Sequence, residues 1–495
     1  MGNKQENPRV YIIGAGFAGR AVAREIKTNA VFGSIVAFLD DDTAKIGQRI
    51  EGVPVLGPIR DIVSLFARTP ADEAIIAIPS ASREFLRELY YLLKNAGFAR
   101  IKILPDVAQI VEGDAHLVQA REIDPQDLLG RSPVAIGLKK SIEWLSGRRV
   151  IVTGAGGSIG SELTRQLLSA GVERLYLFGH GENSIYQIER ELRELQAGGV
   201  GVSTAIVPII GELKDKDYMV DVCRRLKADV VFHAAAYKHV PMMEANTVAA
   251  IENNAFGTQN LVEACLQAGV KRFVLVSTDK AVDPLCVYGA SKLLSEHIVM
   301  DAQSKAGLGE HYMLVRFGNV LGSRGSILPL FMQQVARGGP VTVTDPKAER
   351  YFMTIPEACS LVLKAGGVGR GGESYLLDMG EPIAIRELAE QVIRFSGFEP
   401  DRDIRIEYIG LRPGERLSES LIADNESLER TNYPRINRLV RSGSPFPLEQ
   451  ALEALKPACF LDHAHPDSYR NRRHLREALR AYMPTVEEIP DEPEY

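Results

Sequence analysis

At 495 residues the chain is too long for one ordinary hydrophobic core, so two or three domains are expected. Hydrophobic residues make up 45% of the chain and charged residues 25%, which is the composition of a soluble globular enzyme. The net charge is −6 and the basic residues are dispersed, which argues against nucleic-acid binding because that function needs a concentrated basic surface.

The chain begins with a polar stretch, Met1 to Pro8, that has no apolar run of signal-peptide form. An apolar, β-branched run at Val10–Ile13 then predicts a strand, and a helical pattern follows through Ala21–Ile26. Later elements predicted in this region are the strands Ser34–Leu39, Glu73–Ile78 and Arg100–Leu104 and the helix Ser82–Leu93. Alternating strands and helices indicate a parallel sheet, so residues 1–105 are predicted to form a Rossmann-like domain.

Residues 106–146 contain Asp-Pro, Leu-Leu-Gly and Ser-Pro breaks, which are typical of a connecting segment. The alternating pattern then restarts with the helix Ser161–Leu168 and the strands Arg149–Val152, Leu175–Phe178, Thr204–Ile210, Val230–His233, Phe273–Ser277 and Met313–Phe317. Residues 147–487 are therefore predicted to form a second doubly wound α/β domain. After Val341 the spacing loosens, which favours a smaller C-terminal lobe over one end of the sheet. The acidic tail, residues 488–495, is predicted to be disordered.

A glycine-rich turn lies between the first strand and the first helix of the second domain. Glycine allows the tight turn and the close approach of a pyrophosphate, and the helix N-terminus adds free N–H donors and a positive dipole end. The predicted contacts to a dinucleotide are Gly154, Gly157, Ser158, Ile159 and Gly160. A turn with only a packing role is the alternative.

The first domain has a similar turn, in which Gly14, Gly16 and Gly19 fit the G-x-G-x-x-G pattern. Asp40 lies where a ribose-binding acid would be expected. No catalytic set follows this turn, so a second nucleotide site and a structural relic both stay open.

The position that matches Asp40 in the second domain holds His180, between two glycines, and no acid. No arginine lies nearby to hold a 2′-phosphate, so the choice between NAD and NADP stays open. Glu212, after the third strand, is a candidate for adenine contacts, with a solvated loop acid as the alternative.

The chemistry is expected at Thr278, Asp279 and Lys280, which follow a predicted strand, and at Tyr288 and Lys292. Tyr288 and Lys292 are four residues apart and share one face of a helix. An ammonium beside a phenol is expected to lower the pKa of Tyr288. Such a tyrosine can take a hydroxyl proton while hydride leaves the same carbon.

Five motifs in this order resemble the polysaccharide-biosynthesis (capsule-type) UDP-N-acetylglucosamine 4,6-dehydratases, which belong to the extended short-chain dehydrogenases. They are Val152-Thr-Gly-Ala-Gly-Gly-Ser-Ile-Gly-Ser-Glu162, His233-Ala-Ala-Ala-Tyr-Lys-His-Val-Pro241, Ser277-Thr-Asp-Lys-Ala281, Arg316-Phe-Gly-Asn-Val320 and Arg412-Pro-Gly-Glu415. The resemblance is strongest from about Val150 to Glu419. Arg9 to Pro105 looks like the Rossmann-type domain that precedes catalysis in longer members.

The resemblance implies that tightly bound NAD or NADP oxidises C4 of a UDP-sugar, that water is lost across C5–C6, and that hydride returns to C6. The cofactor is thereby recycled. Tyr288 would act at C4 with Thr278 bonded there, Asp279 would protonate the departing C6 hydroxyl, and Lys280 would be the base at C5. Burial and the Lys292 charge are expected to lower the pKa of Lys280 so that its amine is neutral, while Asp279 stays protonated.

The resemblance also implies where the two ligands bind. Asn319, Arg350 and Arg412 would hold the substrate diphosphate, with Glu415 in the same motif as Arg412. Ala234, Ala235, Lys238 and Asn254 lie in motifs near the cofactor, and a structural role for Lys238 and Asn254 is the alternative.

Two features depart from the family pattern. Longer members begin with membrane helices, whereas no run here reaches the roughly 18 apolar residues that a spanning helix needs. Many of those members also carry methionine where this chain has Tyr288, which leaves the C5 configuration of the product open.

Five cysteines without a CxxC pair predict neither a zinc site nor a disulfide framework. The expected location is the cytoplasm, or its membrane face if the chain is a truncated form.

Two other functions would use part of the same set of residues. A nucleotide-sugar epimerase would share the glycine-rich turn, Tyr288 and Lys292 but would need no Asp279–Lys280 pair. A non-catalytic NAD(P)-sensing protein would not need the intact set of Thr278, Tyr288 and Lys292.

A homo-oligomer is also expected, most simply a dimer through the helix Tyr288–His297. The N-terminal domain is expected to be dispensable for the chemical step.

Overall fold

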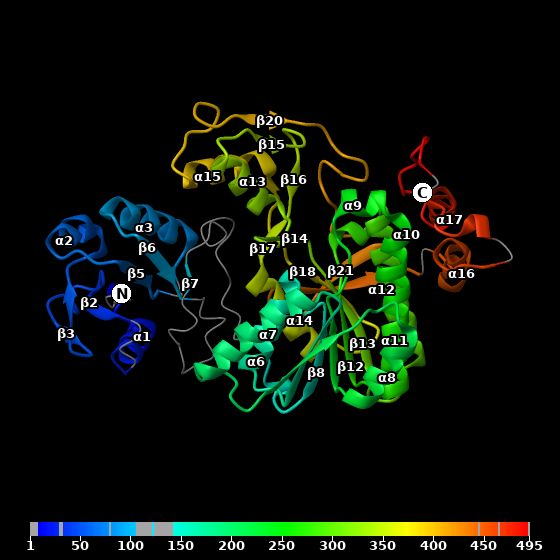
Figure 1. Cartoon of the computed structure of the whole chain (residues 1–495), viewed down its shortest axis with the longest axis horizontal. Coiled ribbons are helices and arrows are strands. Elements are labelled where there is room, and N and C mark those ends of the chain that lie inside the picture. Colours follow the sequence, from blue (N-terminus) through cyan, green and yellow to red (C-terminus); the bar gives the residue numbers. More distant parts are fainter. Residues whose placement is uncertain are drawn as a thin grey trace, which may run out of the picture. The chain divides into compact units, whose positions relative to one another are not determined.

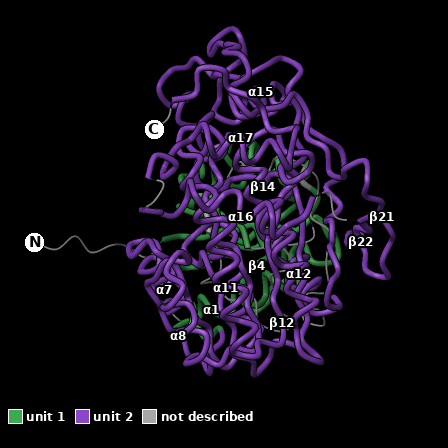
Figure 2. Tube along the Cα trace, turned by 90° about the vertical axis from the view of Figure 1, so that its right-hand side faces the viewer, with its two compact units in different colours: residues 1–140, 195–200 green, residues 141–194, 201–495 purple. Residues whose placement is uncertain are grey.

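The computed structural model describes residues 8–28, 33–78, 81–104, 121–122, 142–443, 446–463 and 466–493. Most of the predicted connecting segment, residues 106–146, and the last two residues of the chain lie outside this part. The chain divides into two compact units, one of residues 1–140 and 195–200 and the other of residues 141–194 and 201–495 (Figure 2).

In its described residues unit 1 has a seven-stranded sheet of order β3-β4-β2-β1-β5-β6-β7. The strands from β4 to β6 run parallel, and β3 and β7 each pair antiparallel with their neighbour. The elements are β1 (Arg9–Ile13), α1 (Phe17–Thr28), β2 (Ser34–Leu39), β3 (Arg49–Ile50), β4 (Val53–Leu56), η2 (Ile59–Asp61), α2 (Ile62–Arg68), β5 (Glu73–Ile76), α3 (Arg83–Ala96), β6 (Arg100–Ile103) and β7 (Arg121–Glu122). The helices connect the parallel strands, as the alternating pattern predicts (Figure 1).

Unit 2 has a nine-stranded sheet in its described residues, of order β10-β9-β8-β11-β12-β13-β18-β22-β21. The first seven run parallel, and β22 and β21 are antiparallel. The strands are β8 (Arg149–Thr153), β9 (Arg174–Gly179), β10 (Ala205–Ile210), β11 (Val230–His233), β12 (Arg272–Val276), β13 (His311–Arg316), β18 (Ser374–Leu377), β21 (Glu426–Arg430) and β22 (Ile436–Arg441). The strand order reverses between β8 and β11, and ligands of such sheets bind outside the carboxyl ends at this switch point.

Helices cover both faces of this sheet (Figure 1). The described helices of the main body of unit 2 are η4 (Glu143–Leu145), α6 (Ser158–Ser169), α7 (Glu182–Ala197), α8 (Lys216–Leu226), α9 (Val240–Ala245), α10 (Thr247–Ala250), the π-helical η5 (Ile251–Phe256), α11 (Gly257–Ala268), η6 (Asp279–Ala281), α12 (Val287–Lys305), α14 (Ile355–Val368), α16 (Leu448–Cys459), η7 (Pro466–Ser468) and α17 (Arg472–Tyr482). The predicted α/β fold with two doubly wound parallel sheets is confirmed.

A smaller lobe lies beyond one end of the sheet (Figure 1). Its elements are β14 (Asn319–Leu321), α13 (Ile327–Ala336), β15 (Val341–Val343), β16 (Glu349–Arg350), β17 (Phe352–Thr354), β19 (Ile383–Ala384), α15 (Ile385–Phe395) and β20 (Ile406–Tyr408). The lobe predicted after Val341 takes up only part of that stretch, and it also includes β14 and α13, which precede Val341. The chain returns to the main sheet at β18 and again at β22, because these short strands are apolar on their buried sides.

The outer face of α12 is covered by the C-terminal helices. Phe446 packs on His297 with ring centroids 4.8 Å apart, and Leu452 and Leu455 of α16 join Ile298 in one buried cluster. Helix α16 also contacts α12, and both α16 and α17 contact α10 (Figure 1). The Tyr288–His297 face is therefore not available for the predicted dimer contact, and self-association through another surface stays a prediction.

Glu488 and Glu492 of the acidic tail form ion pairs with α17, so the prediction of disorder is wrong for residues 488–493. Glu492 is 2% exposed and lies 2.5 Å from the guanidinium of Arg476, which is itself buried. A buried carboxylate needs such a partner, and this pair offsets the cost of removing both charges from water.

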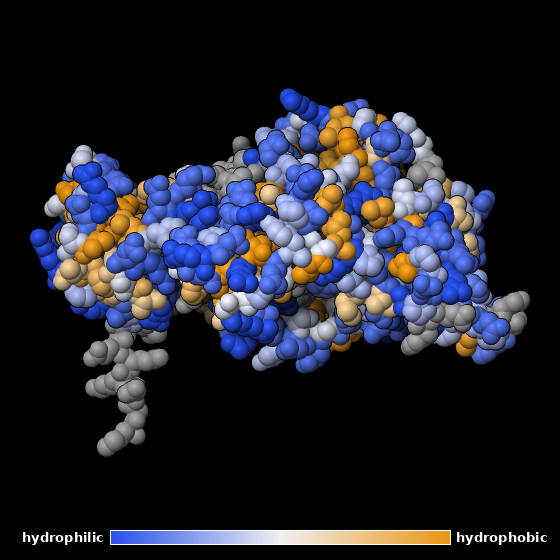
Figure 3. Space-filling model, turned by 90° about the horizontal axis from the view of Figure 1, so that it is seen from above, coloured by the Kyte–Doolittle hydropathy of each residue, from blue (hydrophilic) through white to orange (hydrophobic). Residues whose placement is uncertain are grey.

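Apolar residues on the face shown in Figure 3 lie in separate groups among charged ones. The exposed large apolar side chains include Tyr408, Ile409, Leu411 and Leu417 of the small lobe and the segment after it. Among the described helices, none combines the length and the apolar character needed to cross a bilayer.

Candidate active site

The second glycine-rich turn joins β8 to α6 at the switch point of the unit 2 sheet. Gly154 has φ +67°, and a Cβ there would lie 2.8 Å from backbone atoms of Ala235. Because a side chain is excluded at this position, the turn packs closely against the backbone after β11. The first N–H groups of α6 then face the carboxyl edge of the sheet. Arg324 closes one side, because its N–H donates to Ser158 Oγ at 3.0 Å and its guanidinium to Gly156 O at 2.9 Å.

The other predicted cofactor residues lie along the same edge. His180 follows β9, Glu212 follows β10, and Ala234 and Ala235 follow β11, next to β8 in the sheet. The Glu212 carboxylate is exposed and lies 3.7 Å from Lys214 Nζ. The fold therefore brings these residues together at one edge, where a dinucleotide could lie across the ends of β9, β8 and β11.

Both the oxygen and the NH₂ group of the Asn254 carboxamide form hydrogen bonds within the protein. Its oxygen accepts from Tyr237 N–H at 2.8 Å, and its NH₂ donates to Tyr237 O and Ser291 Oγ, both at 2.9 Å. Asn254 therefore fixes the loop after β11 against α12. Lys238, on this loop, lies 3.4 Å from Ser323 Oγ, and burial together with the Lys280 charge lowers its pKa.

The Thr278–Lys280 turn begins where β12 ends, and α12 begins a few residues later. Lys280 Nζ lies 3.1 Å from Asn319 Oδ1, 3.2 Å from Asp279 Oδ1 and 3.4 Å from Glu419 Oε1. Thr278 Oγ1 donates to the same Asp279 oxygen at 2.9 Å. The other oxygen, Oδ2, is buried and has no hydrogen-bond partner in the described part of the chain.

These contacts keep Lys280 protonated. Burial alone would lower its pKa, but the carboxylates of Asp279 and Glu419 outweigh burial, and the pKa is raised above its ordinary value. The prediction of a lowered pKa for Lys280 is therefore wrong for the ligand-free protein. Charge pairing dominates because two acids contact the amine, and the neighbouring cation is Arg350 and not Lys292.

Tyr288 lies in the first turn of α12, on the same helix as Lys292. Burial raises the pKa of Tyr288 to about 12, although the Lys280 charge and a hydrogen bond to Thr278 act in the opposite direction. Burial also lowers the pKa of Lys292 to about 8, with Glu296 opposing it, and its Nζ donates to Val276 O at 2.9 Å. The expected lowering of the Tyr288 pKa is thus absent without ligand, because desolvation of the phenolate dominates.

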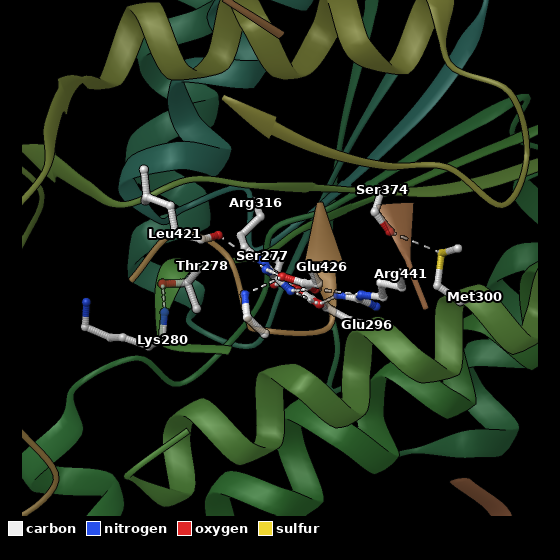
Figure 4. A network of polar contacts seen from close by, with 11 residues as sticks. Ser277, Thr278, Lys280, Glu296, Met300, Arg316, Ser374, Leu421, Glu426 and Arg441 are labelled. Atoms are coloured by element: carbon white, nitrogen blue, oxygen red, sulfur yellow. Dashed lines mark hydrogen bonds and ion pairs between the residues drawn. The ribbon is translucent and has the colours of Figure 1, made fainter. Parts of the chain in front are cut away.

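A buried ion-pair cluster lies behind this turn (Figure 4). Ser277 Oγ donates to Glu296 at 2.5 Å, and Arg316 joins Glu296 to Glu426 with contacts of 2.7 Å to each. Arg441 contacts both acids. The cluster connects α12, the residue before Thr278 and the C-terminal strands, and the charges around Glu296 lower its pKa.

The predicted substrate residues are only partly brought together. Asn319 contacts Lys280, whereas the Arg350 guanidinium donates to three backbone carbonyls, of Glu349, Arg416 and Leu417. Arg412 is half exposed and pairs with Glu415 at 2.5 Å. Arg350 thus holds the 416–419 segment, and Arg412 faces the solvent next to it.

Glu419 was not among the predicted site residues. It is nearly buried and contacts both Lys280 and Arg350, the second at 3.7 Å. The last recognised motif ends at Glu415, and Glu419 lies four residues after it. This closeness to the motif is the signal that could have identified Glu419.

The first glycine-rich turn, with Gly14, Gly16 and Gly19, lies between β1 and α1. The carboxylate of Asp40, the expected ribose-binding acid, is bonded to other groups of the protein. Asp40 accepts from Ala15 N–H at 2.7 Å and pairs with Lys45 at 3.2 Å. Burial would raise the pKa of Asp40, but hydrogen bonds from two backbone N–H groups and Lys45 lower it. A second nucleotide site here stays a prediction.

Residues 150–441 match the family of polysaccharide biosynthesis proteins, and residues 2–105 match a family described as a CoA-binding domain. The capsular polysaccharide biosynthesis protein CapD of Staphylococcus aureus is 41% identical over 438 residues, 88% of this chain and 72% of that protein. An inverting UDP-N-acetylglucosamine 4,6-dehydratase of Campylobacter jejuni is 32% identical over 302 residues, 60% of this chain and 84% of that enzyme.

A UDP-glucose 4-epimerase of Rickettsia canadensis is also 32% identical, over 266 residues that cover 53% of this chain and 76% of the epimerase. Among solved structures, Pen from Bacillus thuringiensis has 32% sequence identity and a TM-score of 0.55, and the match covers 60% of this chain and 90% of that one.

Proposed function

Because the chain belongs to the family of polysaccharide biosynthesis proteins, and is related to NAD-dependent UDP-sugar dehydratases and epimerases, we propose that it is a UDP-N-acetylglucosamine 4,6-dehydratase for surface-glycan synthesis. The observation that carries this proposal is the Asp279–Lys280 pair beside Tyr288. An acid and an amine 3.2 Å apart fit elimination, whereas exchange of configuration at C4 needs no such pair.

The residues fit a dinucleotide. The turn at Gly154 has no room for a side chain, and Gly154, Gly157, Ser158, Ile159 and Gly160 would hold the pyrophosphate at the N-terminus of α6. When bound, NAD(P) supplies the hydride acceptor and donor, and the positive charge of its oxidised ring favours the Tyr288 phenolate. Tyr288 then takes the proton of the C4 hydroxyl, with Thr278 bonded at the same oxygen.

Elimination needs a neutral amine and a protonated acid. One proton passed from Lys280 Nζ to Asp279 Oδ1 produces both, and the net charge of the pair stays zero. A bound sugar would exclude water and favour the neutral pair, because desolvation penalises both charges. Lys280 can then accept the C5 proton while Asp279 gives its proton to the departing C6 hydroxyl. On return of hydride to C6, Lys280 would give its proton back to C5, and the proton that Tyr288 took from the C4 hydroxyl would replace the one that Asp279 lost with the water.

The test is Lys280→Ala with UDP-N-acetylglucosamine in deuterated water, followed by NMR. The variant should bind substrate and form some reduced cofactor, yet lose C5 exchange by about 10²–10⁴-fold. Lys271→Ala is the control, because Lys271 is exposed and pairs only with Glu310 among the described residues. Near-parental C5 exchange in Lys280→Ala would remove Lys280 as the base. An epimer from the parent enzyme would replace the dehydratase by an epimerase, and no product with any UDP-sugar would favour a sensing role.

A further inference from the structure

The C-terminal segment after α17 runs back to the candidate active site. Thr485 Oγ1 donates to Pro284 O at 3.0 Å, and Glu487 N–H donates to Leu285 O at 2.8 Å. Pro284 and Leu285 lie between the Asp279–Lys280 pair and the start of α12. The segment 483–493, which we name the C-terminal strap, thus contacts the connection between the two parts of the proposed catalytic set.

The strap also contacts the Arg412–Glu415 turn. Gly414 N–H donates to the Glu487 carboxylate at 2.8 Å. Gly414 has φ +77°, and a Cβ there would lie 2.7 Å from the Cβ of Cys286, the N-cap residue of α12. The turn is therefore pressed onto the start of the catalytic helix, with Glu487 on its other side.

Buried groups fix the strap at both ends. Met483 and Val486 are at most 3% exposed and belong to the main core cluster. At the far end, Arg476 contacts Glu492 at 2.5 Å and Glu244 at 2.8 Å. Glu244 in turn accepts from Val287 N–H, in the first turn of α12, at 2.7 Å. The strap is thus connected to the N-terminal end of α12, and it holds the Arg412–Glu415 turn against that same end.

We propose that the C-terminal strap positions the Arg412–Glu415 turn for the nucleotide sugar, with Glu487 as the positioning residue. The inference rests on the proposed function and on the role that the family resemblance implies for Arg412, which is to bind the diphosphate of the substrate. Arg412 bonds only to Glu415 of its own turn among the described residues, so its side chain lies where the turn puts it. An ordered turn spares the substrate the entropy of fixing it, which improves affinity.

The experiment compares Glu487→Ala, Glu487→Gln and Glu488→Ala by hydrogen exchange and by steady-state kinetics. Glu487→Ala should speed amide exchange at Gly414 and raise KM for UDP-N-acetylglucosamine, each by about 3- to 10-fold, while kcat changes less than twofold. Glu487→Gln keeps an acceptor oxygen and should restore most of both. Glu488 is exposed and pairs with Arg480, so Glu488→Ala should match the parent.

A second variant tests the role of the strap without changing the Glu487 side chain. Val486→Ala keeps the Gly414 hydrogen bond but loosens the buried anchor, so it should change exchange and KM in the same direction. Parental exchange at Gly414 in both variants would overturn the contact, and faster exchange with an unchanged KM would overturn its role in binding. If the parent enzyme uses no UDP-sugar, the proposed function fails, and this positioning role fails with it even where the exchange data support the contact.

Discussion

At the scale of single residues, the site is governed by which charges face Lys280. Asp279, Glu419, Tyr288 and Arg350 act on it from four different segments, and the two carboxylates prevail. In the ligand-free protein Asp279 and Lys280 therefore form an ion pair.

Glu419→Gln should lower the pKa of Lys280, because one of the two carboxylates that oppose the effect of burial would be removed. The pKa can be measured in ligand-free protein from the pH dependence of lysine acylation, with Lys280 read by peptide mass spectrometry. Glu429→Gln is the matched control, since Glu429 is exposed and pairs with Arg438. An unchanged labelling midpoint in Glu419→Gln would show that Glu419 does not set the charge of Lys280.

Lys292 makes a separate prediction for stability. Its folded pKa of about 8 lies below its ordinary value of 10.5, so between these values the unfolded chain binds the extra proton. The contribution of Lys292 to the free energy of unfolding should therefore rise with pH from about 8 to 10.5. Urea unfolding of the parent and Lys292→Met at pH 7.5 and 10 measures it. A pH-independent difference between the two proteins would contradict the assignment.

The sequence predicted the site residues unevenly. Thr278, Asp279, Lys280, Tyr288 and Lys292 lie together because they come from one strand end and the next helix, which local pattern can predict. Glu419 joins them from a loop far along the chain, and no spacing rule links it to Lys280. The pKa directions were wrong for Lys280 and Tyr288 because they depend on burial and on such distant charges.

At the scale of elements, the sequence predicted the first six strands of the unit 2 sheet within one or two residues, since each is a largely apolar run and all but β10 are mostly buried. It missed β18, β21 and β22. Charged residues, among them Glu426 and Arg441, interrupt the apolar pattern of β21 and β22. The charges are tolerated because they pair with Arg316 and Glu296 inside the fold.

This cluster should dominate the stability of the C-terminal strands. Arg316→Met would leave the Glu296 and Glu426 carboxylates buried with less compensation, at a cost of about 3–5 kcal/mol. Arg438→Met, on the exposed side of β22, should cost much less, because solvent screens its pair with Glu429. Chemical denaturation measures both, and the double variant Glu296→Gln with Arg316→Met should recover part of the loss. Equal costs for Arg316→Met and Arg438→Met would contradict this account.

At the scale of the whole molecule, every proposed catalytic residue belongs to unit 2. A fragment that starts near Ser132 should therefore fold and keep a kcat within about threefold of the parent. The reason is that general acid–base catalysis depends on groups within hydrogen-bond reach of the substrate. Turnover by product NMR and cofactor absorbance are the measurements. A fragment that folds and binds cofactor but produces nothing would assign unit 1 a part in the chemistry.

The strap also has a consequence for the order in which the protein matures. Synthesis proceeds from the N-terminus, and segments already made fold while later ones are still being added. Gly414 and Leu285 leave the ribosome before Glu487, so the hydrogen bonds that the strap gives them form only when translation is nearly complete. A nascent chain can acquire its glycine-rich turn and its catalytic helix early. The turn that carries Arg412 is fastened last, so a chain stalled before residue 487 lacks this fastening.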